Sequence, residues 1–442
     1  MVTDPVQRIR TRTYETPFDL DLHDVLGDLA NLPPAPDAPY LTVSLDWTPG
    51  FDNPGRRPPE EQRRSEQRNA PLESTSQRPA LTWFDAETRA LLGTLDERSP
   101  QRASLEADVA RVRSWLESEL DPAARGVVVV SSQGQDLFMP LVLGVAVPNR
   151  ISHAVLPSLD VLAHVAEDYA TYAVLTCNQQ EAELMLVTQG TQAEGITLES
   201  TLFPRKQASG GWNQRRYQAR ADERVAAFAR TIADEVTKAL SETGVDVLVL
   251  VGSETFTRVL LLEFPDQVRE QVAGVVRMDF QQHPGQQAVI GAAAPLAMAA
   301  EREREGATVA SVRDQLGGGR AVAGAVDVVN ALKAGQVQTL VMNEDYVETG
   351  WADYVYPVYG PGAIPDEHPL GGNVEDIVEV ALQEELIRYT LLQDGDVELV
   401  HTRVPVTAET SASQEAGGIP RSEPATRLDE VGGVAALLRF AR

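Results

Sequence analysis

The apolar run VDVLVLVGS at residues 245–253 constrains the fold more than any other stretch of the chain. A strand without a polar face suits a sheet that is covered on both sides. A long helical pattern precedes the run and ends near Gly244, where a helix C-cap belongs. Its apolar residues share one helical face: Val225, Phe228, Ile232, Val236 and Leu240. A helix is expected at 254–263 and a strand at 272–280, and this alternation of helices and strands predicts an α/β unit.

The same alternation recurs on both sides of that unit. Strand patterns stand at 40–47 and 126–132, and a helix is expected over 104–120. Three strand-like runs then open the middle unit, at 169–177, 182–190 and 197–204. Further along, a helical segment at 292–315 is followed by two helix–glycine–strand patterns and a closing strand, at 320–346, 373–404 and 433–441. We therefore predict an α/β or α+β protein of three domains.

Composition shifts suggest where the domains begin and end. We expect an N-terminal extension over 1–35 and an N-terminal α/β domain over 36–160, in which the Pro-, Arg- and Glu-rich loop 48–80 is mobile. The middle domain is expected over 161–298, with the loop 204–216. The C-terminal domain would fill 299–442, with a polar loop at 405–425.

Charge and cysteine content narrow the class of protein. The formal net charge of −27 argues against a protein that coats nucleic acid with its whole surface. The single cysteine, Cys177, excludes an intramolecular disulfide and fits a reducing cytoplasm. No N-terminal signal peptide is expected, and the longest apolar run, 137–147, is shorter than the ~20 residues of a membrane helix.

Familiar catalytic and cofactor motifs are missing. The six histidines are scattered without HExxH or paired-cysteine spacing, so we expect no metal site. No G-x-S-x-G elbow, Walker A or GxGxxG pattern follows a strand, so no nucleotide cofactor is expected. The glycines of LGGGR at 316–320 lack the accompanying Lys-Ser/Thr and are interpreted as a loop between helices.

One segment stands out against the acidic background. Residues 204–220, PRKQASGGWNQRRYQAR, contain five cations and no acid. Its glycines, Gly210 and Gly211, permit backbone angles closed to other residues and a close approach by a partner. Trp212 offers a stacking face, and Gln214 carries an uncharged donor and acceptor. The segment predicts a contact with an RNA backbone, and a solvated loop before an arginine-rich helix start is the alternative.

These features resemble the middle domain of archaeal and eukaryotic class-one peptide-release factors and Pelota, in which a Gly-Gly-Gln tip occupies the same loop. VDVLVLVGSETFTRVLLLEF is similar to the strand and helix that follow the tip in that family, and AVAGAVDVVNALKAGQVQTLVMNEDY resembles the start of its third domain. The resemblance covers about residues 163–442 and comes nearest to the bacterial Vms-type peptidyl-tRNA hydrolases, with the Balon-type hibernation factors related. It implies a ribonuclease-H-like middle domain and a C-terminal αβα sandwich.

The resemblance also implies an activity and a set of site residues. It predicts ester hydrolysis of peptidyl-tRNA on the ribosome, with large-subunit RNA and peptidyl-tRNA as partners, a translational GTPase as a further candidate partner, and no membrane or DNA partner. The catalytic tip would consist of Gly210, Gly211 and Gln214. The expected RNA-binding residues are Arg205, Lys206, Trp212, Asn213, Arg215, Arg216, Tyr217 and Arg220.

Two departures from the family pattern bear on the activity. Trp212 and Asn213 separate the glycines from Gln214, and the Asn-Ile-Lys-Ser element that signals stop-codon reading is missing. We therefore expect codon-independent ribosome rescue or nascent-chain release. The alternative is a hibernation factor that fills the ribosomal A site without catalysis.

Overall fold

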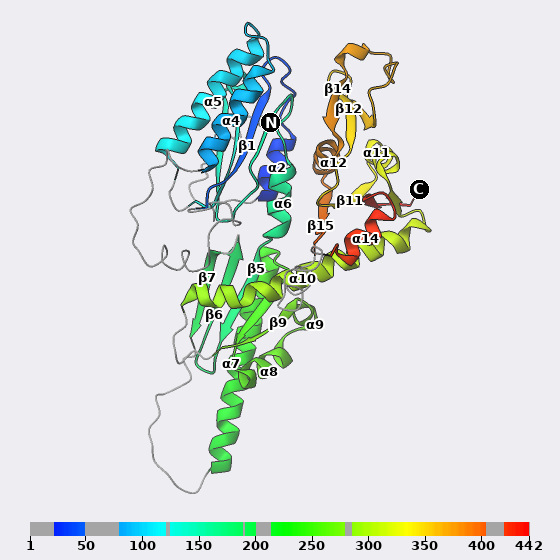
Figure 1. Ribbon diagram of the computed structural model, residues 1–442. Helices are drawn as coiled ribbons and strands as arrows, with labels where there is room; N and C mark the ends of the chain where they lie inside the picture. Colours follow the sequence, from blue (N-terminus) through cyan, green and yellow to red (C-terminus); the bar gives the residue numbers. More distant parts are fainter. Residues whose placement is uncertain are drawn as a thin grey trace, which may run out of the picture. The chain divides into compact units, whose positions relative to one another are not determined.

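The structure of the protein is a computed structural model that describes residues 22–48, 79–120, 124–188, 191–199, 214–278, 285–403 and 420–441 (Figure 1). The chain divides into two compact units. One comprises Met1–Asp168 together with Glu305–Arg442, and the other is the continuous stretch Tyr169–Arg304. Within the described residues, no helix combines the length and hydrophobicity that a membrane crossing requires.

The continuous unit is built on a mixed five-stranded sheet of order β7-β6-β5-β8-β9. The strands are β5 (Tyr172–Cys177), β6 (Glu181–Thr188), β7 (Thr191–Glu199), β8 (Leu248–Gly252) and β9 (Val272–Arg277). β5, β8 and β9 are parallel, whereas β6 and β7 run antiparallel to their neighbours. This mixed sheet, flanked by helices, confirms the ribonuclease-H-like prediction for the middle of the chain.

Helices cover both faces of this sheet, as the apolar sequence of β8 predicts. On one face, Leu248 and Leu250 pack with α7 (Gln214–Thr243) and α8 (Glu254–Glu263), after which α9 (Asp266–Glu270) leads into β9. On the other face, Val249 and Val251 pack against the first turns of α10 (Gln286–Leu316). Leu248–Val251 are all fully buried.

The first part of the discontinuous unit is an antiparallel sheet of order β3-β2-β1-β4. Its strands are β1 (Tyr40–Asp46), β2 (Gly126–Ser132), β3 (Leu137–Leu143) and β4 (Arg150–Ala154), with the 3₁₀ turn η3 (Gln133–Gln135) between β2 and β3. One face packs against α4 (Pro79–Gly93) and α5 (Pro100–Ser118), and the other against α2 (Leu22–Ala30) and α6 (Asp160–Asp168).

The last part of the chain is the expected αβα sandwich. Its sheet has the order β10-β16-β11-β15, with only β11 and β15 parallel. These strands are β10 (Ala321–Ala323), β11 (Val337–Asn343), β15 (Asp396–Val400) and β16 (Val434–Leu438). α11 (Ala325–Lys333) and α12 (Leu382–Leu391) cover one face, and the end of α10 with α14 (Glu423–Asp429) covers the other.

A second, three-stranded sheet follows β11 in the chain. It has the order β13-β12-β14, is antiparallel throughout, and consists of β12 (Thr349–Asp353), β13 (Val358–Pro361) and β14 (Val378–Ala381). The 3₁₀ turn η5 (Val374–Asp376) precedes β14. No strand was expected here, and the stretch from 373 was expected to be helical, whereas β14 occupies 378–381; strands of four or five residues leave too short a pattern in the sequence.

α12 joins the two parts of the discontinuous unit. The buried guanidinium of Arg388 donates to the carbonyl oxygens of Leu29 at 3.3 Å, Ala30 at 3.0 Å and Pro157 at 2.8 Å. One turn earlier, Glu384 accepts hydrogen bonds from the Ser158 hydroxyl and the Leu159 amide. A single hydrophobic core therefore runs from α2 and α6 into α11 and α12. The division into three domains stays a prediction.

Several local predictions need correction. Residues 22–30 were expected to belong to an extension with little periodicity, yet they form α2, whose Val25, Leu26 and Leu29 are buried. The glycines of 316–320 connect α10 to the strand β10 instead of joining two helices. A strand of three residues, paired with β16, is too short to leave a pattern in the sequence. Most of the expected mobile loop 48–80, and most of the polar loop 405–425, lie outside the described residues.

Candidate nucleic-acid interface

The predicted tip lies between β7, which ends at Glu199, and α7, which begins at Gln214. Gln214 is thus the first residue of a helix, and the expected loop 204–216 overlaps α7 by three residues. Arg215, Arg216, Tyr217 and Arg220 follow in its first two turns. The other predicted site residues lie outside the described residues: Arg205, Lys206, Gly210, Gly211, Trp212 and Asn213.

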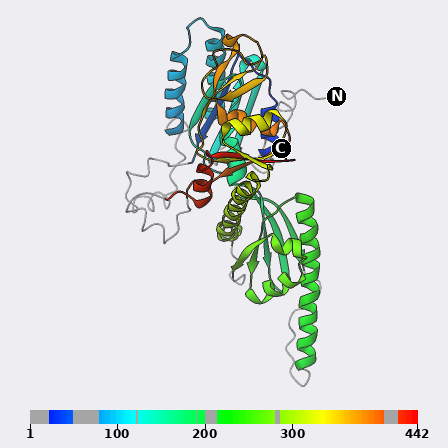
Figure 2. The same cartoon turned by 90° about the vertical axis from the view of Figure 1, so that its right-hand side faces the viewer.

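The body of α7 anchors this end of the helix to the sheet. Phe228, Ile232 and Val236 are buried against the sheet and α8, and the Phe228 ring lies 6.1 Å from that of Phe256. Phe228 is the first buried side chain among those described in α7, and at 1.5 Å per residue it stands about 21 Å along the axis from Gln214. Figures 1 and 2 show the first turns of α7 projecting beyond the sheet of their own unit.

The charge of the helix start opposes the stability of the helix. The first turn of α7 contains Arg215 and Arg216 and no acid. Because the N-terminus of a helix carries a positive partial charge, each cation there costs roughly 0.3–1 kcal/mol, whereas an anion is stabilised. The local sequence therefore favours an anionic partner over an isolated helix end, and phosphate groups are such partners.

Three of the histidines among the described residues form ion pairs: His164, His368 and His401. His401 lies between Asp168 and Glu305, and the hydrogen bonds that its ring donates to both carboxylates raise its pKa to about 10. His164 contacts Asp160, four residues earlier in α6; although burial lowers the pKa of this imidazole, the hydrogen bond and charge of Asp160 prevail and raise it to about 9. Only the His164–Asp160 pair was visible in the sequence, as an i,i+4 spacing.

The cysteine offers no reactive thiol. Cys177 is the last residue of β5 and is 1% exposed, and burial raises the pKa of its thiol to about 12. A nucleophilic cysteine needs the opposite, a lowered pKa and access to solvent. Cys177 is therefore a core residue.

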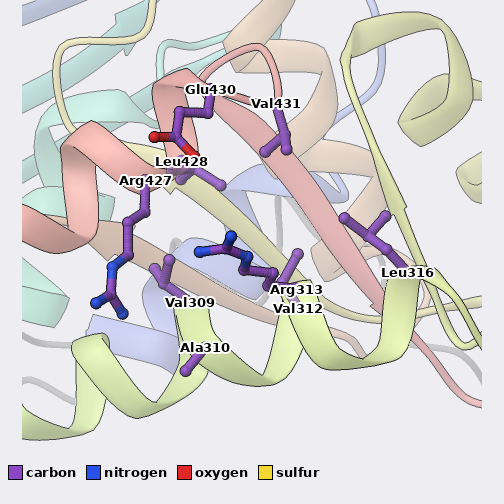
Figure 3. A pocket seen from close by; sticks show the side chains of 9 residues that line it. All are labelled: Val309, Ala310, Val312, Arg313, Leu316, Arg427, Leu428, Glu430 and Val431. Atoms are coloured by element: carbon purple, nitrogen blue, oxygen red, sulfur yellow. The ribbon is translucent and has the colours of Figure 1, made fainter.

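A shallow apolar groove lies between α10 and α14 (Figure 3), with a volume of about 380 Å³ that includes solvent at its mouth. Its apolar lining includes Val309 and Val312 of α10 and Leu428 of α14. The ionisable residues at the groove are Arg313, Arg427 and Glu430. This set contains no nucleophile paired with a general base, which hydrolytic chemistry would need. We assign no catalytic role to the groove.

Comparison with known proteins finds a family match for the middle of the chain. Residues 157–304 match the model of the bacterial archaeo-eukaryotic release factor family 10. The middle of the chain, residues 157–304, is thus similar to this release-factor family. The match covers the continuous unit with its β5–β9 sheet, as well as the whole basic segment 204–220.

The individual proteins to which the chain is similar are distant in sequence. Peptide chain release factor subunit 1 of Methanopyrus kandleri is 24% identical over 190 residues, which make up 42% of this chain and 46% of that protein. The chain thus spans less than half the length of this curated relative. The crystal structure of an archaeal translation termination factor is 16% identical, with coverage of 95% and 97% and a TM-score of 0.23. Pelota from Archaeoglobus fulgidus is 14% identical, with coverage of 72% and 79% and a TM-score of 0.30.

Proposed function

We propose that this protein binds the ribosome in the cytoplasm and hydrolyses the ester of peptidyl-tRNA without reading a codon, as in ribosome rescue. One observation carries the proposal. The family match at 157–304 includes an all-basic segment that ends in a helix start without acids. Large-subunit RNA and peptidyl-tRNA are the proposed partners of that segment.

The proposed mechanism follows from the residue types at the tip. Hydrolysis of the ester needs an aligned water molecule and stabilisation of the developing oxyanion. Gly210 and Gly211 would admit the tip to a site where RNA leaves no room for side chains. Gln214 would order the water or offer its backbone N–H to the oxyanion, since a carboxylate there would face surrounding phosphates at high cost.

The cations would hold the RNA around the reacting ester. Arg205, Lys206, Arg215 and Arg216 neutralise phosphates in this proposal, so that ribosome binding becomes salt-dependent although the protein is acidic. Replacing Arg215 and Arg216 with alanine should flatten the slope of log affinity against log salt by about one to two units. The matched control is Arg89→Ala with Arg98→Ala, two exposed cations near α4 and α5 that should leave the slope unchanged.

Peptide release tests the catalytic step. Ribosome complexes with labelled peptidyl-tRNA in the P site are incubated with the protein, and the freed peptide is measured. We expect Gln214→Ala to lose on the order of 10²-fold in release rate while binding persists. Gln218→Ala, the same substitution one turn further along α7, is the matched control and should retain the wild-type rate.

The spacing of the tip supports a second candidate function. Trp212 and Asn213 separate the glycines from Gln214, and this spacing favours a tip in which Gln214 does not contact the ester. A hibernation factor would occupy the A site through the same cations without turnover. If the wild-type protein binds ribosomes tightly but frees no peptide, the hydrolase proposal is wrong and this second function replaces it. If it neither binds nor releases, both are wrong.

A further inference from the structure

The three-stranded sheet of the C-terminal part carries a charge pattern of its own. We call residues 344–381, which include β12, β13 and β14, the acidic lobe. The acidic lobe contains nine Asp and Glu residues and no Lys or Arg. Asp366, Glu367, Glu375, Asp376 and Glu379 are all exposed. The charged residues of the lobe itself are therefore all acidic; cations reach it only from outside its sequence, with Arg421 paired to Asp345 and Lys333 lying over the Trp351 and Tyr359 rings.

Large apolar side chains are exposed on the same lobe. Val355 is 71% exposed and Tyr356 48%, both in the turn between β12 and β13, and Leu370 in the following loop is 63% exposed. Leu370 lies close to that turn in space, because the neighbouring His368 ring makes an edge contact with Tyr356 at 5.7 Å. Exposed apolar residues that gather at one end of a sheet mark an interaction site more often than isolated ones do.

A buried polar network fixes the position of these apolar side chains. Asp353 and His368 are almost wholly buried, and His368 Nε2 lies 2.8 Å from Asp353 Oδ2. The other Asp353 oxygen accepts the backbone N–H groups of Val355 and Tyr356. His368 Nδ1 accepts those of Leu370, at 3.1 Å, and Gly372, at 2.9 Å. Since Nδ1 accepts hydrogen bonds, Nε2 carries the proton and donates a hydrogen bond to Asp353 Oδ2.

This network orders an exposed surface in advance of any contact. A buried Asp–His pair contributes little net stability compared with apolar packing. Here it holds the turn and the loop that carry Val355, Tyr356 and Leu370. The base of the lobe is equally fixed: Tyr359 stacks on Tyr389 of α12 with ring centroids 4.1 Å apart. A surface that is already ordered loses less conformational entropy when a partner binds.

We propose that the acidic lobe is a docking surface for a protein segment that presents Lys or Arg together with large apolar side chains. The apolar residues of that segment would contact Val355 and Leu370, and its cations would face the surrounding carboxylates. RNA does not fit this surface, because its phosphates would face the exposed carboxylates Asp366, Glu367, Glu375, Asp376 and Glu379. A second copy of the lobe is repelled for the same reason. The inference does not rest on the proposed hydrolase activity.

Peptide binding to the full-length protein tests the inference. The probe is a short fluorescent peptide that alternates arginine with leucine and tryptophan, and its partner is the same peptide with glutamate in place of arginine. Binding is measured by fluorescence anisotropy for the wild type and for two lobe variants, Val355→Asp with Leu370→Asp and Glu367→Lys with Asp376→Lys. The controls change equally exposed residues elsewhere: Leu262→Asp in α8 and Glu87→Lys in α4.

We expect the basic peptide to bind the wild-type protein, and its affinity for each lobe variant should be at least about tenfold lower. Its affinity for each control variant should stay within about twofold of the wild-type value. The glutamate peptide should not bind. If Glu87→Lys weakened binding as much as Glu367→Lys with Asp376→Lys, the peptide would follow net charge alone; if Leu262→Asp weakened it as much as Val355→Asp with Leu370→Asp, the apolar contact would not be specific to the lobe; either result would show that the proposal is wrong. Binding of a single-stranded RNA oligonucleotide, or self-association in sedimentation velocity, that is abolished by the lobe variants would equally overturn it.

Discussion

Replacing His401 with glutamine should remove most of one pH-dependent contribution to the stability of the discontinuous unit. His401 Nε2 lies 2.7 Å from Asp168 of α6, and Nδ1 lies 2.5 Å from Glu305 of α10. The backbone N–H of His401 also donates to Glu305, at 3.2 Å. Because both ring nitrogens face carboxylates, the imidazole must hold two protons to satisfy them. Glutamine carries no charge and can reach only one of the two acids.

The sign and size of the effect follow from the pKa. The two hydrogen bonds raise the pKa of His401 from about 6.5 to about 10. Below pH 6.5 the stabilisation is complete; between 6.5 and 10 the unfolded chain has lost the proton that the folded one keeps, so stability falls as pH rises. At about 1.4 kcal/mol per pH unit, the ceiling is about 5 kcal/mol. Asp168 is 36% exposed and screened by water, so we expect about 3 kcal/mol.

Urea unfolding followed by tryptophan fluorescence measures this contribution. The discontinuous unit contains four of the five tryptophans, Trp47, Trp83, Trp115 and Trp351. The free energy of unfolding of the wild type should exceed that of His401→Gln by about 3 kcal/mol near pH 7, and the difference should vanish above about pH 10.5. His164, which also titrates in this range, is present in both proteins and cancels. A difference that stays constant with pH would refute the reasoning.

Three further predictions concern the core. Arg388→Met should lower the free energy of unfolding by about 3–5 kcal/mol in the same urea assay, because three buried carbonyl oxygens lose their donor; a loss below 1 kcal/mol would contradict this role. Gly252→Ala should destabilise the continuous unit by about 1–3 kcal/mol, since its Cβ would stand 2.4 Å from the Cys177 carbonyl oxygen. The matched change Gly291→Ala, in an open position of α10, should instead stabilise it by up to about 1 kcal/mol, and thermal melts should separate the two. The buried Cys177 thiol should react with a thiol reagent at neutral pH only as fast as the unit opens; a rapid reaction of the native protein would disprove its burial.

Much of the fold follows from local pattern. The apolar run at 245–253 became β8, and the helix expected over 254–263 is α8, with the same bounds. Apolar periodicity also placed α7, whose predicted face is the buried one. α2 shows the limit of the method: its apolar spacing is present in the sequence, but nine residues are fewer than the window over which periodicity is judged.

Less of the candidate site than of the fold could be predicted from the sequence. Composition revealed the basic segment 204–220, yet the loop was expected to continue to 216, three residues into α7, although arginine and glutamine are good helix formers. Contacts between distant residues leave no local signal. Glu305 and His401, 96 residues apart, are one case, and the Asp353–His368 network inside an unassigned sheet is another.

The discontinuous core imposes an order of events during synthesis. Arg388 donates a hydrogen bond to the carbonyl oxygen of Leu29, which precedes it by 359 residues. At a translation rate of about 5–20 residues per second, Arg388 is therefore synthesised about 20–70 s after α2. The continuous unit, Tyr169–Arg304, is complete before then, and its sheet needs no later residue. On stalled nascent chains, the continuous unit should therefore already resist proteolysis while the apolar face of α2 is still exposed. A nascent chain of this protein thus depends on its last third to shield its first.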